Sequence, residues 1–207
     1  MAPTNLQSLI VPHVKQILER HVKETDVCLE LGCGPGQYRL VVPGNYIGLD
    51  ITAQDYKPGF PRMVDVVADA QALPFKNVCF DVVFIVAAFY QIHDTSAVLG
   101  GVHRILKLSG RFLIFDYNYR TTKRLKRQEH KGVNSNHVWT PWGLRRKLRQ
   151  GGFQAEIVDL ADLYPQDPRP RWKRWLLRLG LGRWLQLLRA QLREGWNIVI
   201  GVKTVSE

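Results

Sequence analysis

Apolar residues along the chain fall in short runs of strand length, separated by stretches with helical spacing. The runs are 27–31, 46–49, 63–68, 82–86, 112–115, 155–160 and 196–202. Helical spacing marks residues 95–108 and 141–150, and an N-terminal helix ending near Lys23 that Pro12 bends or restarts. Nearly continuous apolar strands that alternate with helices are typical of a parallel sheet covered on both faces.

The seven runs predict an α/β fold with a seven-stranded, mostly parallel sheet and helices on both faces. A chain of 207 residues favours one domain, so we assign residues 1–207 to it. The last two runs are separated by a basic segment rich in Trp and Leu, residues 165–193. We expect this segment to be a helical insertion before the last strand.

Charge is distributed unevenly along the chain. A composition of 45% hydrophobic and 23% charged residues excludes wholesale disorder, yet the net charge is +11. Residues 1–116 carry a net −1, whereas 117–150 carry +9 and 165–196 carry +6. A one-sided positive field attracts nucleic acid, anionic membrane or acidic substrates, although a solvated surface would look the same.

The three cysteines, Cys28, Cys33 and Cys79, are too few for a disulfide framework and lack metal-ligand spacing. We therefore expect no disulfide partner and no metal site. The chain shows no secretion signal, since its first Lys is Lys15, and the apolar run 82–90 is too short to span a bilayer. We expect a cytoplasmic protein, with peripheral attachment at the inner membrane face as an open alternative.

A glycine-rich turn follows the first strand. Gly32, Gly34 and Gly36 let the backbone approach a ligand closely, but a dinucleotide fingerprint would need its third glycine at position 37, which is Gln37. The second strand ends at Asp50, where a carboxylate can accept hydrogen bonds from ribose hydroxyls. NAD and S-adenosylmethionine both contain an adenosyl ribose, so these residues alone do not choose between them.

An ordered set of motifs carries a family resemblance over residues 27–118. It reads E-L-G-C-G-P-G, G-L-D, A-D-A-Q-A-L-P-F, F-D-V-V-F and R-I-L-K-L-S-G-R-F-L-I. The chain resembles class I S-adenosylmethionine-dependent methyltransferases of the subfamily that acts mostly on small molecules and lipids. The resemblance implies a Rossmann-like fold, S-adenosylmethionine as cofactor, and a methyl acceptor that is small or lipid-linked. Our leading hypothesis is that an oxygen of such an acceptor, for example a saccharide or an isoprenoid, is methylated, with carbon or nitrogen as the alternatives.

The resemblance also implies roles for particular residues. Glu30 and the glycine turn would face the methionine part of the cofactor, Asp50 the ribose, and Asp69 with Ala70 the adenine. The segment 86–94 would form a wall of the pocket. The implied cofactor contacts are Glu30, Gly32, Gly34, Gly36, Asp50, Ile51, Asp69, Ala70 and Val86. Two departures from the family pattern, His103 and Ser109-Gly110, affect only the packing between a helix and the next strand.

A methyl acceptor with a poorly nucleophilic hydroxyl needs a general base. His93, just past the fourth strand, is the first candidate and His137 the second, although each could be structural. Tyr90, Tyr117 and Tyr119 could shape the acceptor site or simply pack.

Two basic segments remain to be explained, 119–131 and 171–193. In the second, Trp and Leu fall on one helical face and Arg on the other, which is typical of a helix in an anionic membrane interface but also of helices packed on the protein's own sheet. RNA methylation is the alternative enzymatic hypothesis, disfavoured because A-A-F-Y-Q-I-H-D lacks an Asn/Asp-Pro-Pro-aromatic motif. A cofactor-binding scaffold without catalysis is the third.

Overall fold

The computed structural model describes residues 11–55, 62–118, 121, 137, 139–158 and 196–204. Seven strands form one sheet: β1 (Val27–Leu31), β2 (Asn45–Asp50), β3 (Val66–Val67), β4 (Phe80–Val86), β5 (Leu106–Tyr117), β6 (Phe153–Ile157) and β7 (Trp196–Lys203). Three α-helices, α1 (Pro12–His21), α2 (Thr95–Ile105) and α4 (Pro141–Gln150), and two short 3₁₀ helices, η2 (Gln37–Leu40) and η3 (Phe89–Gln91), belong to the same part of the chain.

The strand order is β3-β2-β1-β4-β5-β7-β6. All pairings are parallel except those of β7, which runs antiparallel to both β5 and β6. The chain moves from β1 outward to β3 and then returns to β4 on the other side of β1. This reversal leaves a crevice at the carboxyl ends of β1 and β4, where open α/β sheets bind ligands.

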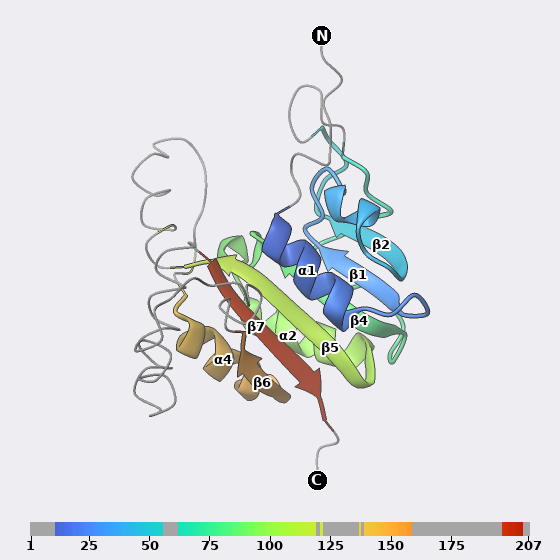
Figure 1. Ribbon diagram of the computed structural model, residues 1–207. Helices are drawn as coiled ribbons and strands as arrows, with labels where there is room; N and C mark the ends of the chain where they lie inside the picture. Colours follow the sequence, from blue (N-terminus) through green and yellow to red (C-terminus); the bar gives the residue numbers. More distant parts are fainter. Residues whose placement is uncertain are drawn as a thin grey trace, which may run out of the picture.

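The two faces of the sheet bury separate cores, because successive side chains of a strand point to opposite faces. In β4, Val82 and Phe84 pack with α1, whereas Val83 and Ile85 pack with α2 and α4. Figure 1 shows α1 in front of the sheet and α2 behind it. The predicted α/β fold, a mostly parallel seven-stranded sheet covered on both faces, is therefore confirmed.

Several predicted boundaries were wrong. The third strand was expected over 63–68, but only Val66 and Val67 pair with β2. The helix expected over 95–108 ends at Ile105, and the chain enters β5 at once. Helix α1 begins at Pro12, in agreement with the alternative that Pro12 restarts the helix; the missing N–H costs nothing in the first turn, and residues 1–10 lie outside the described part of the chain. The predicted insertion, residues 165–193, lies outside the described residues.

The two departures from the family pattern are accommodated by packing. The ring of His103 lies edge-on to Phe153, with centroids 5.3 Å apart. Ser109 and Gly110 lie in a bulge of β5, since Phe80 pairs with Leu106 while Val82 pairs with Arg111. Ser109 has φ 61°, and a Cβ added at Gly110 would lie 2.8 Å from the carbonyl oxygen of Lys107.

This bulge predicts opposite effects for two neighbouring substitutions. Gly110→Ala should lower the free energy of unfolding by about 1–3 kcal/mol, because the new methyl group has no room. Ser109→Gly should leave it unchanged or raise it by up to about 1 kcal/mol, since glycine tolerates the left-handed conformation. Urea unfolding measures both. An equal decrease of the free energy of unfolding in the two variants would contradict the conformation described for Ser109 and Gly110.

Candidate functional site

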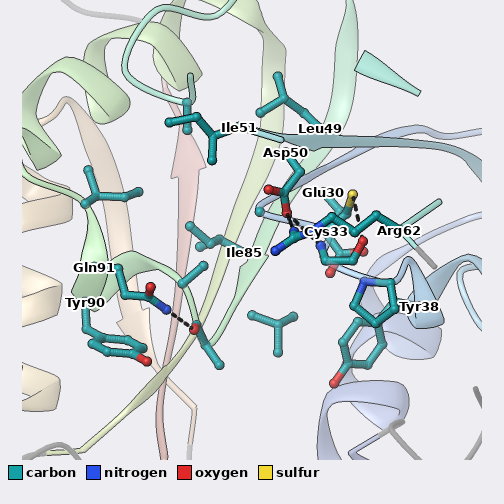
Figure 2. A pocket seen from close by; sticks show the side chains of 18 of the residues that line it. Glu30, Cys33, Tyr38, Leu49, Asp50, Ile51, Arg62, Ile85, Tyr90 and Gln91 are labelled. Atoms are coloured by element: carbon teal, nitrogen blue, oxygen red, sulfur yellow. Dashed lines mark hydrogen bonds and ion pairs between the residues drawn. The ribbon is translucent and has the colours of Figure 1, made fainter. Parts of the chain in front are cut away.

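A cavity of about 680 Å³ opens at the carboxyl ends of β1, β2 and β4. This volume lies within the range of small-molecule and cofactor sites. In Figure 2, Glu30, Asp50 and Arg62 come from one side of the cavity and Tyr90 and Gln91 from the other. The cavity coincides with the crevice that the strand order creates, as expected for a ligand site in this type of sheet.

The glycine turn after β1 forms part of this cavity. Gly32, Gly34 and Gly36 have φ values of 68°, 54° and 71°, which L side chains rarely adopt. A Cβ added at Gly32 would lie 2.9 Å from the Cβ of Ala88, which follows β4. Glycine at position 32 therefore allows the β1 turn to approach the β4 end closely.

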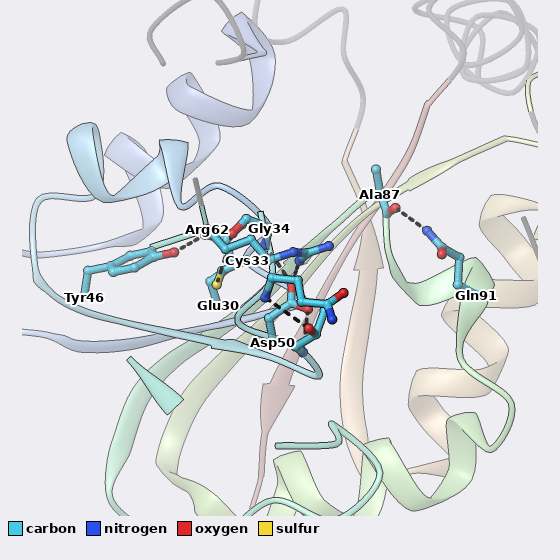
Figure 3. A network of polar contacts seen from close by, with 10 residues as sticks. Glu30, Cys33, Gly34, Tyr46, Asp50, Arg62, Ala87 and Gln91 are labelled. Atoms are coloured by element: carbon cyan, nitrogen blue, oxygen red, sulfur yellow. Dashed lines mark hydrogen bonds and ion pairs between the residues drawn. The ribbon is translucent and has the colours of Figure 1, made fainter. Parts of the chain in front are cut away.

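Asp50, the last residue of β2, is buried and holds this turn in place. Its Oδ2 accepts a hydrogen bond of 2.8 Å from the backbone N–H of Gly34. The same oxygen pairs with the guanidinium of Arg62, 2.5 Å away, and Figure 3 shows this contact beside the glycine turn. Arg62 was not predicted from the sequence, because it lies twelve residues beyond Asp50 and outside any motif.

Glu30 lies deep in the cavity and is 1% exposed. The hydroxyl of Tyr46 donates a hydrogen bond to its Oε2 (Figure 3). Arg39 lies over the Tyr46 ring, 4.7 Å from its centroid, and pairs with Asp65. Burial raises the pKa of Glu30 to about 8, although the Tyr46 hydrogen bond opposes this shift. Glu30 is therefore mostly protonated in the ligand-free protein at neutral pH.

Asp69 and Ala70 line the cavity beyond β3. Asp69 accepts hydrogen bonds from the backbone N–H of Gln71, at 2.8 Å, and from the Gln71 side-chain amide. Gln71 in turn accepts a hydrogen bond of 2.7 Å from the backbone N–H of Asp94, which caps α2. These contacts connect the Asp69 side of the cavity to the segment that follows β4.

The other predicted site residues are placed as follows. Lining the cavity are Ile51, Val86, Tyr90, His93 and Tyr117. His137 does not line it, but its Nε2 lies 3.2 Å from the carbonyl oxygen of His93 and its backbone N–H donates to the carbonyl of Tyr90. Tyr119 lies outside the described residues.

Several lining residues were not predicted from the sequence, among them Tyr38, Arg62 and Trp196. Trp196 begins the last strand, and its position became visible only through the antiparallel pairing that sets it opposite Tyr117. Tyr38 follows the glycine turn within the quoted motif region but carried no chemical signal of its own.

Comparisons with known proteins agree with this geometry. The methyltransferase domain family matches residues 29–114. A chain of the complex between the Haloferax volcanii Trm112 methyltransferase activator and a methyltransferase superimposes with a TM-score of 0.66 and 25% identity, covering 94% of this chain and 89% of that one. Residues 29–114 therefore belong to the class I S-adenosylmethionine-dependent methyltransferase family.

Two curated relatives align with more of the chain than residues 29–114. Malonyl-[acyl-carrier protein] O-methyltransferase of Geobacter sulfurreducens is 23% identical over 198 residues, 86% of this chain and 74% of that protein. The human mitochondrial arginine-hydroxylase NDUFAF5 is 30% identical over 159 residues, 69% of this chain and 46% of the human protein. The chain spans less than half the length of the first curated relatives it matches.

S-adenosylmethionine is the cofactor of this methyltransferase family, and the cavity has features that fit it. The glycine turn lets a ligand approach the backbone, and buried carboxylates stand at the ends of β1 and β2. Among the described residues, no three His, Cys, Asp or Glu side chains are grouped as metal ligands.

The raised pKa of Glu30 predicts a pH dependence of stability for the methyltransferase domain. Between pH 4.5 and 8 the unfolded chain ionises Glu30 while the folded protein keeps it protonated, so the free energy of unfolding should fall as the pH rises. Relative to Glu30→Gln, the free energy of unfolding of the wild type should fall by on the order of a few kcal/mol across this pH range. Urea unfolding from pH 5 to 8 measures the difference.

The exposed Glu24 provides the matched control. The free energies of unfolding of Glu24→Gln and the wild type should differ by the same small amount at every pH. A stability difference between the wild type and Glu30→Gln that does not change with pH would contradict the raised pKa of Glu30.

Proposed function

We propose that this protein is an enzyme that transfers a methyl group from S-adenosylmethionine to an oxygen of a small or lipid-linked acceptor. One observation carries the proposal: a single cavity joins the glycine turn, Glu30, Asp50 and Asp69 to a wall that contains Tyr90 and His93. The first group suits an adenosyl cofactor and the second a methyl acceptor. The Geobacter relative, an O-methyltransferase by name, supports an oxygen as the methylated atom.

In this proposal Glu30 faces the methionine part of the cofactor, Asp50 the ribose, and Asp69 with Ala70 the adenine. When bound, the cofactor supplies an electrophilic methyl group. The acceptor oxygen bonds to the methyl carbon as the sulfur–carbon bond breaks, and the hydroxyl proton passes to a base. Positioning and exclusion of water supply much of the acceleration, since the leaving group is already good.

His93 is the proposed base. It lines the cavity just after η3 and directly precedes Asp94, which caps α2 through the N–H groups of Ser96 and Ala97. The Nε2 of His137 contacts the His93 carbonyl, so in this arrangement His137 positions the His93 backbone. His137 therefore supports the site from outside the cavity.

The human relative is named an arginine-hydroxylase, so similarity alone leaves the reaction open. Methyl transfer and hydroxylation can be distinguished by incubating cell extracts with the protein and with S-adenosylmethionine that carries a label in its methyl group. Label that moves to an extractable acceptor supports methyl transfer. Cofactor that binds while no label moves, under conditions where the acceptor is present, contradicts it.

The membrane proposal rests on sequence alone. Residues 171–193 lie outside the described residues, and attachment to an anionic surface stays a prediction. No helix in the described ranges is long and apolar enough to cross a bilayer. Two basic side chains of α4, within residues 117–150, contact other described residues: Arg145 donates to the carbonyl of Ala155, and Lys147 to the Ser96 hydroxyl. Arg146 and Arg149 are exposed and available to a partner.

Arg62 predicts an unusual response of cofactor affinity. Because Arg62 occupies the Asp50 carboxylate, Arg62→Gln should strengthen binding several-fold, and more for S-adenosylmethionine than for S-adenosylhomocysteine, since the sulfonium charge is repelled by the guanidinium. Asp50→Ala should weaken both at least tenfold. Calorimetry measures the affinity of each of the two variants for S-adenosylmethionine and for S-adenosylhomocysteine.

Arg146→Gln, on the exposed face of α4, is the matched control and should change neither affinity. Weaker binding in Arg62→Gln would mean that Arg62 contacts the cofactor. Unchanged binding in Asp50→Ala would refute the ribose assignment.

The role of His93 is tested by turnover measured alongside cofactor affinity. His93→Gln should reduce methyl transfer in the extract assay by about 10²-fold or more, as for loss of a general base, with S-adenosylhomocysteine affinity unchanged. His103→Gln, a histidine packed against Phe153 away from the cavity, should keep wild-type turnover. Unchanged turnover in His93→Gln would refute the base.

A further inference from the structure

Three aromatic rings from three separate elements line one end of the cavity. Tyr90 comes from η3, Tyr117 from the end of β5, and Trp196 from the start of β7. The centroids of Tyr90 and Tyr117 are 5.6 Å apart with a tilt of 54°, and those of Tyr117 and Trp196 are 4.7 Å apart with a tilt of 47°. We call these three residues the aromatic wall.

The aromatic wall is held from behind by two fully buried polar side chains. Asp116 accepts a hydrogen bond of 2.9 Å from the backbone N–H of Tyr117. Asn197, its partner across β5 and β7, donates to the carbonyl oxygen of Tyr117 at 3.3 Å. Burial raises the pKa of Asp116 well above its usual range. The three rings of the wall are themselves uncharged, and these buried contacts hold the backbone of Tyr117 in place.

Charge divides the cavity into two ends. The described lining residues that bear carboxyl or guanidinium groups, Glu30, Asp50, Arg62 and Asp69, lie on β1 and β2 or in the segments before and after β3. Val11 and Tyr38 line the cavity and belong to the same apolar cluster as Trp196, and Ile92 directly follows η3. An anionic group placed against the wall would lose hydration without gaining a partner from these residues, whereas a flat ring would gain stacking on the tilted aromatic faces.

We propose that the aromatic wall binds the acceptor through a flat, uncharged ring, so that the substrate class is an aromatic or quinonoid hydroxyl compound. This inference rests on the proposed function, which places the acceptor at this end of the cavity. His93 lines the same cavity, two residues beyond η3. A ring hydroxyl held against the wall would thus share the cavity with the proposed base.

The experiment compares three probes by calorimetry in the presence of saturating S-adenosylhomocysteine. These are 2-naphthol, its saturated analogue decahydro-2-naphthol, and tetramethylammonium. The wild type should bind 2-naphthol at least tenfold more tightly than the saturated analogue and should not bind tetramethylammonium detectably. Equal affinity for the two alcohols overturns the inference, as does binding of tetramethylammonium without 2-naphthol, which would make the wall a cation site.

Variants assign the preference to the wall. Trp196→Leu and Tyr117→Leu should each lose at least fivefold in 2-naphthol affinity and keep wild-type affinity for S-adenosylhomocysteine, which also shows that they fold. Tyr117→Phe, which retains the ring, should keep the affinity for 2-naphthol. Trp142→Leu makes the same change as Trp196→Leu on α4, outside the cavity, and should match the wild type.

Two failures can be told apart. A wild type that binds no S-adenosylhomocysteine refutes the proposed function, and the inference with it. A wild type that binds S-adenosylhomocysteine but shows no 2-naphthol preference, or Leu variants that retain this preference, refute the inference alone.

Discussion

The site depends on one buried hydrogen bond, from the backbone N–H of Gly34 to the carboxylate of Asp50. It ties the turn after β1 to the end of β2, and the parallel register that pairs Leu31 with Leu49 brings the two together. A buried carboxylate needs partners to remain charged, and here it has the Gly34 N–H and the Arg62 guanidinium. The glycine turn and the Asp50 carboxylate therefore stabilise each other, and together they form one side of the cavity.

The cavity separates two kinds of recognition. Its polar end contains two acidic side chains with very different surroundings: Asp50 is paired with the Arg62 guanidinium, whereas Glu30 accepts a hydrogen bond from the Tyr46 hydroxyl and is mostly protonated. Its other end is aromatic and uncharged among the described residues. The contact from Gln71 to the Asp94 backbone connects the two ends, so the same chain segments position both. This division suits an enzyme that holds a polar cofactor beside a less polar acceptor.

Features that depend on neighbouring residues, such as helix ends and residues at the ends of strands, were predicted from the sequence. Helix α4 was predicted with its observed bounds, because Pro141 starts it and Thr140 caps it through the Gly143 N–H. Glu30 and Asp50 lie at the carboxyl ends of β1 and β2, and Asp69 lies just beyond β3, so the sheet edge gathers them. The third strand was predicted too long because an apolar run does not reveal how many residues find a partner. Arg62 and Trp196 were missed because an ion pair and an antiparallel pairing, neither visible locally, bring them to the site.

In the proposed function Asp50 binds the ribose, and Arg62 occupies its carboxylate in the ligand-free protein. A crystal structure of the protein with S-adenosylhomocysteine would show both contacts. We expect both ribose hydroxyls within hydrogen-bonding distance of the Asp50 carboxylate, the Gly34 hydrogen bond retained, and the Arg62 guanidinium displaced. Cofactor bound with the Arg62–Asp50 pair intact and the ribose elsewhere would contradict it.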